Sequence, residues 1–128
     1  MRKRLIRNPL AQDLEMVGEK GGTLTLRRTD GKQPDVIRLD PFAAEILGAY
    51  LLSVRQKVAG VIPSENLGDR AETTIEHVMH PAPAVKVSQK GAHIDIGSGF
   101  WDHLYCELML ALPYMRREAM SLMPGARH

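Results

Sequence analysis

The chain has 128 residues, of which 44% are hydrophobic and 25% are charged. This length and balance are typical of one globular domain with a single core, and they exclude two independently folded cores. No apolar run approaches the roughly 20 residues of a membrane-spanning helix, and no apolar signal-peptide segment follows the basic first residues. We therefore expect a cytoplasmic protein that forms one domain over residues 1–128.

The cysteine count and the charge distribution narrow the protein class further. Cys106 is the only cysteine, which excludes an intramolecular disulfide and a cysteine-rich zinc module. The net charge is +2, and four positive charges lie within residues 1–8, so the remainder is slightly acidic. We interpret residues 1–8 as a basic arm. Such an arm either contacts nucleic acid or an acidic partner or is a solvated terminus, and both interpretations remain open.

Three strands are predicted in the first half of the chain. Leu14–Val17 is a short apolar segment, Thr23–Arg28 alternates threonine with leucine, and Val36–Leu39 is a second alternating segment. A period of two is typical of a strand with one buried face. The glycines of residues 18–22 and the Asp30-Gly31 pair predict the two turns between these strands.

A helix is predicted to begin at Asp40-Pro41. An aspartate can accept hydrogen bonds from the free N–H groups of the first turn, and proline at the first helical position loses no hydrogen bond. Apolar residues then recur at spacings of three and four from Phe42 to Val58, and the helix is expected to end near Gly60. Small residues on a second face indicate close packing against another helix or subunit: Ala43, Ala44, Gly48 and Ala49.

The second half of the chain repeats these signals after a loop at residues 62–69. Strands are expected at Thr73–Met79, Val85–Ser88 and His93–Ile96, and Gln89-Lys90-Gly91 predicts a hairpin turn between the last two.

A second apolar helix is predicted from Phe100 onward. Ser98 is the expected N-cap of this helix. Pro113 lies inside the helical pattern, so we expect the helix to kink or restart there.

The two halves of the chain are similar to each other. Ile37-x-Leu39 followed by Phe42 matches Ile94-x-Ile96 followed by Phe100, apart from one extra residue. We therefore predict an α+β fold with pseudo-duplicated β-β-β-α units, and one antiparallel sheet with the two main helices packed on one face. The first unit would span residues 13–60 and the second residues 70–120. The inner face of the sheet would consist of Leu24, Leu26, Ile37, Leu39, Val85, Val87, Ile94 and Ile96.

Seven polar side chains of the second half are candidates for catalysis or metal binding: His77, His80, His93, Asp95, Asp102, His103 and Cys106. Their spacing matches no strong metal-site pattern, and the serines lack a nucleophile context. The helix dipole explains an acidic residue in the first turn, as at Asp102. We therefore predict a non-catalytic protein with no catalytic residue, no metal and no cofactor, and rank a metal-dependent enzyme third.

A strand-rich unit that ends in a helix and occurs twice resembles, in topology, the Pur-α and Whirly group of single-stranded nucleic-acid binders. The resemblance implies a curved antiparallel sheet that contacts the strand, with helices packed behind it or forming a dimer. Basic residues on the exposed sheet face and in the arm could meet phosphates. The expected nucleic-acid-binding residues are Arg2, Lys3, Arg4, Arg7, Arg27, Arg38 and Lys86. Aromatic stacking platforms normally add to such binding, yet all six aromatic residues fall on or beside predicted helices.

The alternative is a protein-interaction, assembly or regulatory module. Both predicted helices carry apolar residues on more than one face, which favours a homodimer joined through the helices. Aromatic residues and methionine are enriched at interfaces, and the expected interface residues are Tyr50, Trp101, Tyr105 and Met109. Nucleic acid and protein both remain open as partners, with nucleic acid slightly ahead, and no membrane contact is expected.

Overall fold

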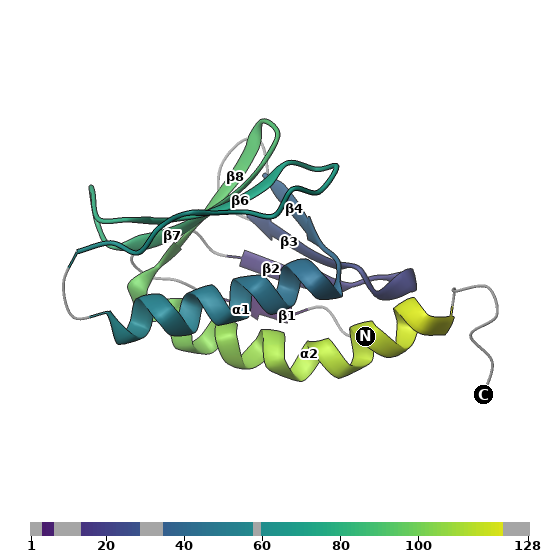
Figure 1. Ribbon diagram of the computed structural model, residues 1–128. Coiled ribbons are helices and arrows are strands. Elements are labelled where there is room, and N and C mark those ends of the chain that lie inside the picture. Colours follow the sequence, from purple (N-terminus) through teal and green to yellow (C-terminus); the bar gives the residue numbers. More distant parts are fainter. Residues whose placement is uncertain (1–3, 7–13, 29–34, 58–59, 122–128) are drawn as a thin grey trace.

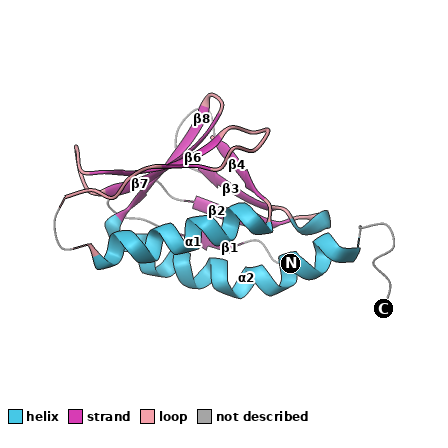
Figure 2. Ribbon diagram, in the orientation of Figure 1, coloured by secondary structure: helices cyan, strands magenta, loops and turns pink. Residues whose placement is uncertain are grey.

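The computed structural model describes residues 4–6, 14–28, 35–57 and 60–121. Within these ranges the chain forms four strands and a long helix, followed by four more strands and a second long helix. Figure 1 shows the strands as a layer above the two helices, and Figure 2 shows the same two layers coloured by secondary structure. The predicted α+β class is confirmed, but the strands form two antiparallel sheets where one was expected.

The first sheet has the order β1-β2-β3-β4. Its strands are β1 (Arg4–Ile6), β2 (Leu14–Gly18), β3 (Leu24–Arg28) and β4 (Val36–Leu39), and the 3₁₀ helix η1 (Lys20–Gly22) lies between β2 and β3. Strand β1 lies within the predicted basic arm, where Arg4 pairs with Met16 of β2. Two apolar residues, Leu5 and Ile6, follow Arg4 and favour strand structure at this edge.

The second sheet has the order β5-β6-β7-β8. Its strands are β5 (Glu65–Asn66), β6 (Thr73–Val78), β7 (Ala84–Gln89) and β8 (Ala92–Gly97). In the described residues, each half of the chain therefore has four strands where three were predicted. The additional strands, β1 and β5, are short edge strands without an alternating pattern, so the sequence did not reveal them. The predicted turn is confirmed: Gln89 pairs with Ala92 across Lys90-Gly91, and Lys90 has a φ of 51°, as such two-residue loops require.

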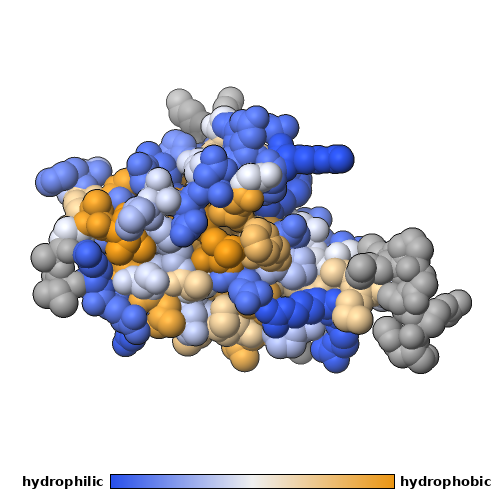
Figure 3. Space-filling model, in the orientation of Figure 1, coloured by the Kyte–Doolittle hydropathy of each residue, from blue (hydrophilic) through white to orange (hydrophobic). Residues whose placement is uncertain are grey.

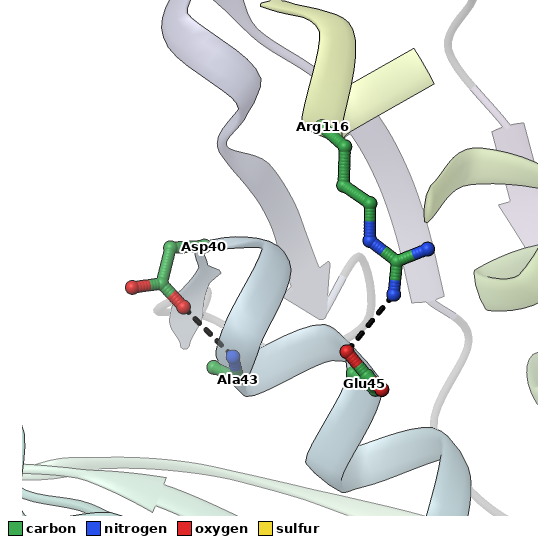
Figure 4. A network of polar contacts seen from close by, with 4 residues as sticks. All are labelled: Asp40, Ala43, Glu45 and Arg116. Atoms are coloured by element: carbon green, nitrogen blue, oxygen red, sulfur yellow. Dashed lines mark hydrogen bonds and ion pairs between the residues drawn. The ribbon is translucent and has the colours of Figure 1, made fainter. Parts of the chain in front are cut away.

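The two long helices are α1 (Pro41–Gln56) and α2 (Trp101–Ser121). Asp40 caps α1 as predicted, since its carboxylate accepts a hydrogen bond of 2.7 Å from the Ala43 N–H (Figure 4). Helix α1 ends at Gln56, whereas its end was expected near Gly60, four residues later.

The second helix differs from the prediction at its start, and it does not restart at Pro113. Ser98 is not the N-cap of α2, because it lies in a short 3₁₀ helix, η2 (Ser98–Phe100), that tightens the chain before α2 begins. Helix α2 continues through Pro113 and does not restart there. The neighbours Leu112 and Met115 are buried on both sides of this proline, and their packing compensates for the hydrogen bond that proline cannot make.

Both sheets share one hydrophobic core with the helices. All eight residues predicted for the inner sheet face are at most 1% exposed, which confirms the alternating pattern as the signal for burial. Helices α1 and α2 cover this face with further fully buried leucines, Leu47, Leu51, Leu104 and Leu108.

The helices pack against each other in antiparallel directions. Arg55 near the end of α1 lies 2.6 Å from Asp102 at the start of α2, and Arg116 near the end of α2 lies 2.9 Å from Glu45 near the start of α1 (Figure 4). Between these ion pairs, a β carbon added at Gly48 would lie 2.6 Å from Met109 Cε. Gly48 of the small-residue face therefore contacts a helix, as the sequence predicted, whereas Ala49 of that face is exposed.

One side chain links the two sheets. The Gln89 amide accepts a hydrogen bond of 2.9 Å from the Arg38 N–H of β4 and donates one of 2.5 Å to the Arg38 carbonyl oxygen. The same amide donates to Thr73 Oγ1 at 3.0 Å. Thr73 is fully buried and donates through its hydroxyl and its N–H to the Asp69 carboxylate, at 2.6 and 2.7 Å. This group of residues, which we call the sheet junction, fixes the edge of β4 beside the second sheet.

The sheet junction makes the stability of the fold depend on pH. Burial alone raises the pKa of the Asp69 carboxyl, but the hydrogen bonds from Thr73 outweigh burial and lower this pKa below its ordinary value. A carboxyl with a lowered folded-state pKa stabilises the fold above its unfolded pKa of about 4, and this stabilisation is lost as the pH falls.

We therefore expect the native protein to lose more stability than the Asp69→Asn variant as the pH falls below about 5. Urea unfolding followed by circular dichroism gives the midpoints, with the exposed Glu65→Gln as the control for loss of a carboxylate. Equal pH dependence in the native protein and Asp69→Asn would show that Asp69 does not contribute to acid sensitivity.

Candidate functional site

The outer face of the two sheets is polar. Because side chains alternate along a strand, the residues between the core positions point away from the helices. On the first sheet these include Arg27 and Arg38, both exposed, and on the second sheet Glu76, Lys86, Ser88, His93 and Asp95. In Figure 3 the strand tips at the top of the view are mostly hydrophilic, and hydrophobic residues gather in patches lower down.

Acidic neighbours accompany two of the three predicted sheet cations. Arg27 Nε lies 3.9 Å from Glu15 Oε1. Lys86 pairs in register with Glu76 on one side and Asp95 on the other, so an acidic residue flanks it on each neighbouring strand. These acids offset the charges of Arg27 and Lys86, and the positive potential of the outer face is weakest around them.

Arg38, the third predicted cation, lies in a more basic environment. A cavity of about 420 Å³ beside the sheet junction is lined by Val36, Arg38, Arg70, Ala71, Gln89 and Lys90. We call Arg38, Arg70 and Lys90 the junction cluster. All three side chains are exposed, and in the described part of the chain none of them forms an ion pair. The nearby Asp69 carboxylate instead accepts hydrogen bonds from Thr73 with both oxygens.

Sequence reasoning missed Arg70 and Lys90. Arg70 lies in the loop before β6, and Lys90 lies in the turn between β7 and β8. The pairing of Gln89 with the edge of β4 brings them beside Arg38, and no local pattern encodes this contact over 51 residues. Of the predicted arm residues, Arg4 lies in β1, whereas Arg2, Lys3 and Arg7 lie outside the described residues.

The residues predicted as a protein interface divide into two kinds. Tyr50 and Trp101 are buried and serve the core: the Tyr50 hydroxyl donates to the Pro63 carbonyl at 3.1 Å, and Trp101 Nε1 donates to the Ile96 carbonyl at 2.8 Å. Burial raises the pKa of Tyr50. Tyr105 and Met109 are half-buried on α2 and remain available as interface residues.

Several of the polar residues named as candidates for catalysis or metal binding make local contacts. Buried His77 accepts a hydrogen bond of 3.2 Å from the Ile62 N–H and stacks edge-on against Trp101. His93 Nε2 lies 4.0 Å from Asp95, and His103 Nε2 lies 3.7 Å from Glu107. Over the residues that the structure describes, no three histidine, cysteine, aspartate or glutamate side chains converge as metal ligands would.

Comparison with known proteins gives no family for this chain. No protein-family model matches the sequence, and no curated protein is significantly similar to it. In the described part of the chain, neither α1 nor α2 is long and apolar enough to cross a bilayer.

Proposed function

We propose that this protein binds single-stranded nucleic acid through the outer face of its two sheets. The observation that carries the proposal is the junction cluster, in which Arg38, Arg70 and Lys90 surround one cavity and form no ion pair in the described part of the chain. Exposed cations that converge without acidic partners match the repeated negative charge of a phosphate backbone. Arginine adds a planar fork that can bind phosphate through two hydrogen bonds.

The arrangement of the fold supports the same proposal. Four strands and a helix occur twice in succession, as expected if the two halves are pseudo-duplicated units of the kind seen in Pur-α and Whirly proteins. The helices cover one face of the sheets, and the exposed Arg27, Arg38 and His93 lie on the other face. Arg27 and the arm residues Arg2, Lys3, Arg4 and Arg7 would extend the phosphate contacts beyond the junction cluster.

Salt dependence of binding tests the proposal. For single strands, the logarithm of the association constant falls with the logarithm of salt concentration with a slope of about −0.7 per neutralised phosphate. Three contacts from the junction cluster give a slope of about −2, and contacts from the arm make it steeper. Fluorescence anisotropy of a labelled oligonucleotide of roughly 20 nucleotides, measured between about 50 and 200 mM salt, gives this slope. An association constant that does not change with salt concentration, or the absence of binding, would refute the proposal.

A second candidate is a homodimer or protein-interaction module that uses the helices. Leu110 on α2 is 71% exposed and Phe42 at the start of α1 is 59% exposed. Large apolar side chains this exposed are typical of association surfaces when they lie together. Half-buried Tyr105 and Met109 would extend such a surface along α2.

Under this second candidate, Leu110→Glu is expected to convert a dimer into a monomer, because a carboxylate would be buried in the contact. Size-exclusion chromatography with light scattering measures the mass directly. Glu118→Gln, a change on the same helix that adds no charge, serves as the control. A native protein that is monomeric at micromolar concentration excludes the dimer.

A further inference from the structure

A second cavity, of about 360 Å³, lies at the far end of the outer face of the second sheet. Its floor is Val78, Ala84 and Gly97, which are cross-strand neighbours on β6, β7 and β8. The turn at residues 80–83 and Ser98-Gly99 form its walls. We call this cavity the sheet-end pocket. Its volume falls within the range of about 300–1,000 Å³ that is usual for small-molecule sites.

The lining of the sheet-end pocket suits a flat ligand with one polar edge. Pro81, Pro83 and the imidazole of His80 offer ring surfaces, and the floor is apolar. The charged side chains in the lining are Lys86 and Asp95, which are directly paired across β7 and β8. An ammonium donor and a carboxylate that can accept two hydrogen bonds therefore line the pocket from neighbouring strands.

The acids around Lys86 disfavour a phosphate in this pocket. Glu76 lies across from Lys86 on β6, and Asp95 lies across from it on β8, where His93 Nε2 is also 4.0 Å from the Asp95 carboxylate. An anionic ligand would meet the Asp95 carboxylate in the pocket, with Glu76 opposite Lys86 as a second nearby negative charge. A neutral, planar ligand with an acceptor next to donors avoids this repulsion.

Guanine is the nucleobase that fits this pattern. Its Watson–Crick edge presents the O6 acceptor beside two adjacent donors, N1–H and the N2 amino group, whereas the other bases each present a single donor group on that edge. The Asp95 carboxylate can accept from both guanine donors while Lys86 donates to O6, and bases of single strands are read on this edge. We propose that the sheet-end pocket binds a guanine base of the single strand; this inference rests on the proposed function.

The position of the pocket supports this assignment. Lys86 on β7 is four residues from Lys90 of the junction cluster, which follows β7 in the turn. This separation is about 13 Å at the rise of an extended strand. A single strand whose phosphates meet the junction cluster can therefore place a base in the sheet-end pocket by crossing Ser88 and His93 on the outer face. The pocket would supply a base contact in addition to His93, since no phenylalanine, tyrosine or tryptophan lies on the described strands.

The test compares a labelled oligo(dT) with the same oligonucleotide carrying one central dG, in the native protein and in two variants. The native protein is expected to bind the dG oligonucleotide about tenfold more tightly, the size of one good two-bond contact. Asp95→Asn should abolish this preference and keep the salt-dependent binding of oligo(dT). Glu76→Gln, which neutralises the other acid beside Lys86, should keep the preference. An oligonucleotide with inosine in place of the central guanosine should bind less tightly than the dG oligonucleotide, because inosine lacks the N2 amino group.

The two proposals fail in different ways. Salt-dependent binding of oligo(dT) with no gain from dG, or the same gain in Asp95→Asn, overturns the guanine pocket and leaves the proposed function intact. A larger gain from a central dA or dC also overturns it. Binding of free guanosine monophosphate that is lost in Asp95→Asn, with no binding of any oligonucleotide, supports the pocket and refutes the proposed function. Circular dichroism melting of each variant establishes that it is folded.

Discussion

Replacing Gly22 with alanine is expected to lower the free energy of unfolding by about 3 kcal/mol. Gly22 has a φ of +87°, and a β carbon at this position would lie 2.3 Å from the Met115 carbonyl oxygen and 2.9 Å from the Ala119 nitrogen. These are backbone atoms of α2, so they cannot move aside as the end of a flexible side chain can. Alanine would therefore force η1 away from α2, in addition to the strain of a left-handed backbone.

Gly68 separates these two contributions. It has a similar φ of +68°, but nothing lies within 4 Å of the β carbon that alanine would add. Gly68→Ala is therefore expected to cost only the backbone strain, about 1 kcal/mol. Urea unfolding followed by the fluorescence of Trp101, the single tryptophan, measures both variants. Equal losses for Gly22→Ala and Gly68→Ala would contradict the close contact between η1 and α2.

The second large effect is expected on binding. Replacing Arg38, Arg70 and Lys90 together with glutamine should weaken binding of a single-stranded oligonucleotide about 100-fold at low salt, because three phosphate contacts are lost. The salt slope should become shallower by about 2. The three side chains are exposed, so the fold should tolerate their neutralisation, and anisotropy titrations at several salt concentrations measure both quantities.

A matched control removes the same charge elsewhere. Lys20, Lys57 and Arg117 are exposed residues of η1, the end of α1 and α2. The variant with glutamine at these three positions has the same net charge as the junction-cluster variant. It is expected to keep most of the affinity and the slope. If both variants lose affinity equally, binding depends on overall charge, and the junction cluster is not the site.

The sequence was sufficient to predict the elements whose signal is local. Alternation along β3, β4, β7 and β8 identified the buried positions, because one face of a strand packs on the core and the other meets water. Asp40-Pro41 defined the start of α1 because the capping chemistry involves adjacent residues. The alternating segments also identified Arg27, Arg38 and Lys86 as outer-face cations.

Features that depend on contacts distant in sequence could not be predicted. The two-residue strand β5 carries no periodic pattern, and it exists only through pairing with β6. Arg70 and Lys90 became site residues because Gln89 holds the edge of β4, and the sheet-end pocket depends on how the turn at residues 80–83 lies over β7 and β8. Tyr50 and Trp101 appeared suited to an interface because residue type alone does not distinguish a buried aromatic side chain from one on a binding surface.

If the protein binds single-stranded nucleic acid as proposed, the sheet junction also determines how the two halves of the chain respond to the bound polyanion. Arg38 belongs to the first sheet, whereas Arg70 and Lys90 belong to the second half, and the amide of Gln89 forms hydrogen bonds with the Arg38 backbone between them. A strand of phosphates lying across all three cations would act as a cross-link between the halves. Occupancy would therefore oppose their separation, and the ligand would make unfolding more cooperative as well as raising its free energy.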